Sequence, residues 1–76
     1  MMTRRECETV AEGVASIAIL TTSTMTDVID LMKVSMRGLE RALLSDKDKS
    51  YKLGQAMLAQ ELTKAYIKRA TQLEIL

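Results

Sequence analysis

The sequence predicts an all-α fold from an apolar periodicity, a single polar loop and the absence of proline. In residues 25–43, apolar side chains recur at intervals of four, three, four, three and four residues. This spacing lines one face of an α-helix and does not match the alternation of a β-strand. The side chains of this stripe are Met25, Ile29, Met32, Met36, Leu39 and Leu43. No proline interrupts the chain, so few positions forbid a helix.

The stripe belongs to a helix that we expect to span about residues 26–44. Acidic residues come early in this segment, at Asp27 and Asp30, and basic residues follow at Lys33, Arg37 and Arg41. This order matches the helix macrodipole, whose N-terminal end is positive and whose C-terminal end is negative. Small residues on the flank of the stripe, Gly38 among them, indicate either a close crossing with a neighbouring helix or, at Gly38, a glycine that the helix merely tolerates.

A shorter helix is expected before it, at about residues 9–20. Thr9 followed by Glu12 reads as a capping box, in which the hydroxyl and the carboxylate each satisfy a backbone N–H group. We expect residues 1–8 to be disordered. The hydroxyl-rich run 21–24 is either a break with a new N-cap near Thr24 or Thr26, or a weak stretch of one long helix. The break is the favoured reading.

The third helix is expected over residues 50–74, after the all-polar stretch 45–50. A short polar connection between two amphipathic helices predicts an antiparallel helical hairpin. We expect one set of apolar residues to form its interior. These residues are Met25, Ile29, Met32, Met36, Leu39, Leu43, Leu58, Leu62, Tyr66 and Leu73.

Residues 1–76 should form one small domain with a weak core. The chain has 76 residues, no Phe and no Trp, and its only aromatic residues are two tyrosines. Aromatic side chains bury the largest area per residue, and short chains bury little surface in any case. We therefore expect the fold to be completed by oligomerisation or by a protein partner.

A second apolar set exceeds what a hairpin alone can cover. Its members lie on the backs of the two long helices, where they would face water. We predict that they form a protein interface. They are Leu31, Val34, Leu53, Met57, Ile67 and Ile75.

The sequence holds little that suggests catalysis. There is no histidine, the commonest general base and metal ligand, and the single cysteine, Cys7, has no base to activate it. Asp46 and Asp48 lack the additional oxygen ligands and the glycine of a calcium loop. We expect no enzyme activity, no metal, no cofactor and no small-molecule substrate.

Nucleic-acid binding is the alternative function. Lys33, Arg37 and Arg41 form a basic stripe, and Lys64, Lys68 and Arg69 form a second basic group; either could contact phosphates. The formal net charge is only +1, whereas nucleic-acid-binding domains are usually strongly basic. Nucleic acid is therefore an unlikely partner on charge alone.

The expected function is that of a non-enzymatic protein–protein interaction module. Such a small helical adaptor, co-chaperone or inhibitor would bind a partner through its apolar helix faces. No apolar run is long enough to span a membrane. The lone cysteine argues against a disulfide scaffold and favours the reducing cytoplasm.

Overall fold

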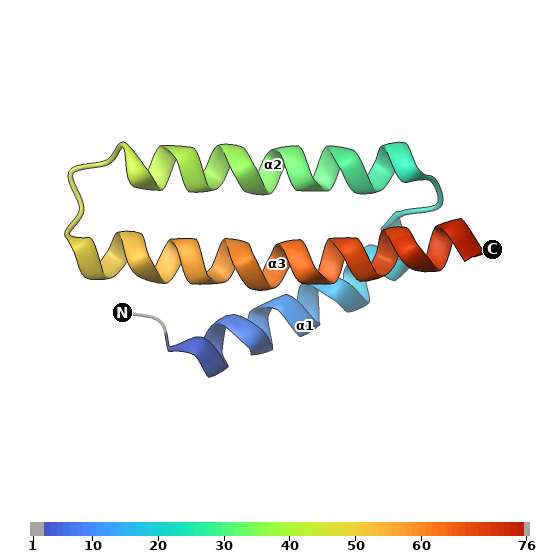
Figure 1. Cartoon of the computed structure of the whole chain (residues 1–76), viewed down its shortest axis with the longest axis horizontal. Helices are drawn as coiled ribbons and strands as arrows, with labels where there is room; N and C mark the ends of the chain where they lie inside the picture. Colours follow the sequence, from blue (N-terminus) through green and yellow to red (C-terminus); the bar gives the residue numbers. More distant parts are fainter. Residues whose placement is uncertain (1–2, 76) are drawn as a thin grey trace.

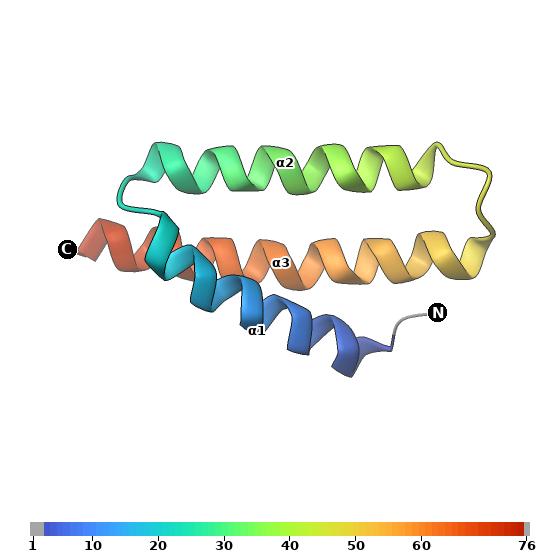
Figure 2. The ribbon, with the colours of Figure 1, turned by 180° about the vertical axis from the view of Figure 1, so that it is seen from behind.

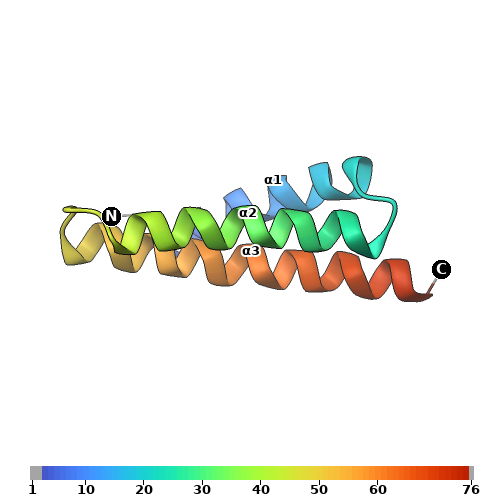
Figure 3. The same cartoon turned by 90° about the horizontal axis from the view of Figure 1, so that it is seen from above.

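The computed structural model describes residues 3–75 and shows three α-helices and no strand within them (Figure 1). Helix α1 spans Arg4–Thr21, α2 spans Met25–Leu43 and α3 spans Lys49–Ile75. The long helices α2 and α3 run antiparallel, and α1 packs against the other side of α3. Figures 2 and 3 show that α1 lies on one side of the layer formed by α2 and α3, in front of α3 in Figure 2, and that it crosses α3 at an angle. Helix α3 is thus the central element.

Helix α1 begins earlier than the sequence suggests. The hydroxyl of Thr3 accepts a hydrogen bond from the Glu6 backbone N–H at 3.1 Å, and the Glu6 carboxylate accepts one from the Thr3 N–H at 3.4 Å. This capping box replaces the predicted one, and the Thr9 hydroxyl instead donates to the Arg5 carbonyl at 2.9 Å. The prediction of disorder for residues 1–8 is therefore wrong for residues 4–8, which are helical, while residues 1–2 lie outside the described part of the chain.

The hydroxyl-rich run breaks the helix, which confirms the favoured interpretation. Thr24 is the N-cap of α2, and its hydroxyl accepts from the Asp27 N–H at 3.2 Å. The Asp27 carboxylate in turn accepts from the N–H groups of Thr24 and Ser23, at 3.1 and 2.9 Å. A second capping box therefore fixes the turn between α1 and α2.

The second connection carries the polar residues that the sequence places there. Asp48 accepts a hydrogen bond from the Tyr51 backbone N–H at 2.8 Å and so caps the first turn of α3. Helix α3 begins at Lys49, one residue before its predicted start.

The buried residues are small. Tyr66 is the only aromatic residue among them, and half of the other eight are alanines. The buried set consists of Cys7, Ala11, Ala18, Thr22, Val28, Ala42, Ala59, Gly54 and Tyr66. Alanine and cysteine let helices approach closely but bury little apolar area, so this core contributes modest stability.

Helix α2 turns a different face to α3 from the one predicted. Val28 and Ala42 are the buried residues of α2, and Ala42 belongs to the small-residue flank of the stripe. The expected hairpin interior is therefore wrong for four members of the stripe, whose side chains are exposed. These are Met25 at 45%, Ile29 at 46%, Met36 at 57% and Leu43 at 46%. Met32 and Leu39 are half-buried at its edge.

A shallow cavity of about 200 Å³ lies between α2 and α3. Gly38 lines it, and a Cβ built on this glycine would meet no other described atom within 4 Å. The close helix crossing suggested at Gly38 is therefore wrong. The remaining lining residues are Ser35, Leu39, Gln55, Leu58, Ala59 and Leu62.

Candidate interaction surface

One side of the layer formed by α2 and α3 carries a group of exposed apolar side chains, which we call the apolar face. It consists of the exposed stripe residues of α2 and two residues of α3. They are Met25, Ile29, Met36 and Leu43 of α2 with Leu53 and Ile67 of α3. Each of these side chains is at least 45% exposed, and monomeric proteins rarely display so many large apolar residues together.

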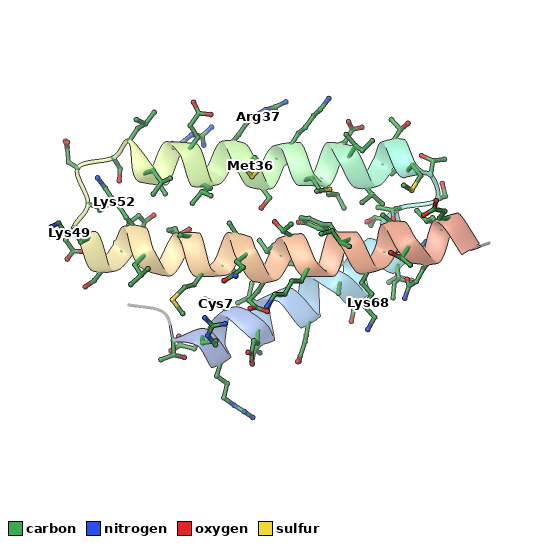
Figure 4. The ribbon with its side chains drawn as sticks, viewed as in Figure 1. Cys7, Met36, Arg37, Lys49, Lys52 and Lys68 are labelled. Atoms are coloured by element: carbon green, nitrogen blue, oxygen red, sulfur yellow. The ribbon has the colours of Figure 1, made fainter. Side chains whose placement is uncertain are left out.

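The apolar face is turned away from α1. Figure 4 shows Met36 on the near side of α2, whereas α1 runs behind α3 in the same view. On α3, residues Gly54 and Glu61 contact α1, and Ala59 and Leu62 line the boundary with α2. Leu53 and Ile67 lie on the remaining side of this helix, which leaves them exposed beside α2.

The predicted interface residues divide among different surfaces. Leu53 and Ile67 belong to the apolar face. Val34 is 62% exposed but lies on the opposite side of α2 from Met36, half a helical turn away. Two of the predicted residues therefore share one side of the molecule, and the third lies on another side.

The other predicted interface residues are partly covered or not described. Met57 is half-buried and shares a helix face with Gly54 and Glu61, which contact α1. Leu31 is half-buried along the edge of the contact between α2 and α3. The side chain of Ile75 lies outside the described residues. Sequence reasoning missed the stripe of α2 as surface because the same spacing equally fits a hairpin interior.

The basic residues do not form one patch. Arg37 projects from the outer edge of α2, whereas Lys68 lies on the far side of α3 next to α1 (Figure 4). Lys64 forms an ion pair with Glu61 at 3.1 Å, and Glu61 also faces Arg4 at 3.7 Å. The basic stripe of α2 and the basic group of α3 therefore lie on different surfaces of the described chain. This separation gives the nucleic-acid alternative no support.

The polar and ionisable groups act within the fold. Backbone N–H groups of Ser23 and Thr24 donate to Asp27 and hold the pKa of its carboxyl below the usual 3.8. Burial raises the pKa of the Tyr66 hydroxyl. The Cys7 thiol is buried, with its sulfur 3.9 Å from the Gly54 carbonyl oxygen.

Among residues 3–75, none of the helices combines the length and the apolar content that crossing a lipid bilayer requires. Within the same residues, no three Cys, Asp or Glu side chains gather in a way that could hold a metal ion.

Comparison of the chain with protein-family models, with curated proteins and with solved structures finds no match.

Proposed function

We propose that this protein is a non-enzymatic interaction module that binds another polypeptide through the apolar face of α2 and α3. One observation carries the proposal: the large apolar side chains lie outside while the core is built from alanine. Met36 and Ile67 are each more than half exposed, whereas Ala18 and Ala59 are buried. Burying a fully exposed large apolar side chain is worth about 1.5–3 kcal/mol, and covering the exposed half of each side chain on the face would contribute about half of that.

The chemistry of the face supports a protein partner. Methionine is flexible and polarizable, and it adapts to the shape of an apolar partner. Met25 and Met36 are exposed on the face and Met32 lies at its edge. Helical packing therefore offers the natural mode of binding, with side chains of a partner helix entering the spaces between these residues. The lone buried Cys7 suits a reducing compartment such as the cytoplasm.

Photo-crosslinking of the full chain in cells tests the proposal. A photoreactive amino acid placed at position 36 should give covalent protein adducts of discrete mass, because the apolar face is covered in the cell. Val34 provides the matched control, since it is an exposed apolar residue of the same helix on the opposite side. The same label at position 34 should give few adducts or none.

Two outcomes would overturn the proposal. The first is the absence of protein adducts at position 36, which would mean that the face stays in contact with water. The second is equal labelling at positions 34 and 36, which would mean that collisions rather than a specific surface produce the adducts.

A further inference from the structure

We infer that the partner covering the apolar face is a second copy of this chain. Two α2–α3 hairpins would stack face to face across a two-fold axis perpendicular to the helices and complete a four-helix bundle. This inference rests on the proposed function, because it names the occupant of the same face. Three observations carry it: the surplus surface area, the symmetry of the two apolar stripes, and the common level of their midpoints.

The surface area of the chain is larger than that of a compact monomer. Its accessible surface is 5486 Å² at a mass of 8.5 kDa. A folded monomer of this mass exposes about 4,700 Å². The surplus of roughly 800 Å² equals the area that one partner buries in a standard protein interface. The exposed side chains of the apolar face contribute to this surplus, together with Ile17, Ile19 and Leu20 of α1, and a second copy would cover the part that lies on α2 and α3.

The apolar stripe of α2 matches the stripe of a second α2 that runs in the opposite direction. Its spacing of four, three, four, three and four residues reads the same in both directions, with its midpoint at position 34. Two antiparallel copies of α2 would therefore stack in matching layers along their whole length, as two-fold contacts require. The layers pair Met25 with Leu43, Ile29 with Leu39 and Met32 with Met36 of the other copy.

The outer stripe of α3 has the same property, and its layers match large residues with small ones. Residues 53, 56, 60, 63, 67 and 70 share one face of the helix, with a midpoint between positions 61 and 62. Reversal pairs Leu53 with Ala70 and Ile67 with Ala56, so a large side chain meets a small one in each layer. The middle layer pairs Gln60 with Thr63.

This middle layer also satisfies its polar groups. The Thr63 hydroxyl donates to the Ala59 carbonyl at 2.7 Å, so its oxygen remains able to accept a hydrogen bond. The exposed amide of Gln60 can donate that bond from the other copy. A polar pair at the centre of an apolar interface favours one register over others.

Both midpoints lie at the same height along the hairpin, so a single axis serves both stripes. The residues that line the cavity between α2 and α3 centre on position 37 of α2 and on positions 58–59 of α3. Because the helices are antiparallel, a position three residues earlier on α2 lies level with a position three residues later on α3. Position 34 of α2 is therefore level with positions 61–62 of α3. These positions are the midpoints of the two stripes, and α1 lies on the other side of α3 and leaves the axis clear.

Sedimentation equilibrium of the purified full chain tests the inference. The wild type should be a dimer at micromolar concentration. Met36→Glu places a charge in a central layer and should raise the dimer dissociation constant by about 30-fold or more, the loss typical of a central interface residue. Since Met36 is 57% exposed in the single chain, helix content by circular dichroism should persist. Val34→Glu, a control on the opposite side of α2, should leave the dimer intact.

Cysteine cross-linking tests the direction of packing. Lys33 and Glu40 lie one heptad apart on the same flank of the stripe. Lys33 is one residue from the proposed axis, so oxidation of Lys33→Cys should link two copies, whereas Glu40→Cys should stay unlinked. Wild-type protein, whose Cys7 is buried, is the control that remains unlinked. Linkage at both positions would indicate parallel packing and overturn the inference.

The inference would also be overturned if the wild type were monomeric at all concentrations. The same holds if Val34→Glu raised the dimer dissociation constant as much as Met36→Glu. These results are distinguishable from failure of the proposed function. A monomer that still gives adducts at position 36 in cells would have a different protein as its partner. A monomer without such adducts would contradict both proposals.

Discussion

Arg69 of α3 caps the C-terminus of α1 through Thr22, which lies 47 residues away in the sequence. Its Nη2 donates to the Thr22 carbonyl oxygen at 2.7 Å, and its Nε donates to the Thr22 hydroxyl at 2.9 Å. The last turn of α1 contains no basic side chain of its own. Arg69 therefore supplies both the hydrogen bonds and the positive charge that a helix C-terminus favours.

Arg69→Met should lower the free energy of unfolding by about 1–3 kcal/mol, because hydrogen bonds to charged groups contribute more than neutral ones. Methionine keeps most of the side-chain length but leaves the Thr22 groups without their donor. Urea denaturation at a fixed protein concentration measures the change. Arg5→Met, on the exposed surface of α1, is the control and should change stability by less than about 0.5 kcal/mol. Equal losses in both variants would contradict the capping role.

The N-terminal boundary of α1 shows where local sequence signals become ambiguous. Thr3 with Glu6 and Thr9 with Glu12 have the same capping-box spacing. Tertiary contact decides between them, because a helix that begins at residue 4 places Cys7 against Gly54 and Ala11 against α3. The sequence predicts the existence and order of the helices, but the start of this helix depends on packing against a helix 47 residues downstream.

The orientation of α2 could not be derived from periodicity for a related reason. The stripe and its small-residue flank are neighbouring faces of one helix, and either could meet α3. In the structure the smaller residues Val28 and Ala42 face α3, which permits close approach. The larger residues such as Met36 then remain exposed. Only Leu53 and Ile67 of the predicted interface were therefore placed on the apolar face in advance.

Gly38→Ala should stabilise the protein by about 0.5–1 kcal/mol, the difference in helix propensity between the two residues. A Cβ at this position meets no described atom within 4 Å, so no steric cost offsets the gain. Thermal and urea denaturation measure the effect. Gly13→Ala is the matched case, since a Cβ there also enters open space. A loss of stability at Gly38 alone would show that another chain approaches this glycine.

The capping carboxylate of Asp27 should make stability depend on pH in the acidic range. Hydrogen bonds from Ser23 and Thr24 lower its pKa in the folded state. A lowered pKa contributes stability fully above the pKa of the unfolded chain, and that contribution is lost as pH falls through the folded-state value. The difference in unfolding free energy between wild type and Asp27→Asn should be largest above about pH 5 and shrink below about pH 4. A difference that stays constant from pH 7 to pH 3 would contradict this.

The buried thiol of Cys7 reports whether α1 stays docked on α3. Its side chain is fully buried, with the sulfur near the Gly54 carbonyl, so a thiol reagent reaches it only when α1 opens. Reaction with an aromatic disulfide should be at least about 100-fold slower in the folded protein than in urea, reflecting the free energy of local opening. Ala11→Glu places a charge in the same contact and should raise the rate towards the unfolded value. Glu12→Gln, on exposed surface one residue away, should leave it unchanged. Fast reaction of the folded wild type would show that α1 is detached from α3 much of the time.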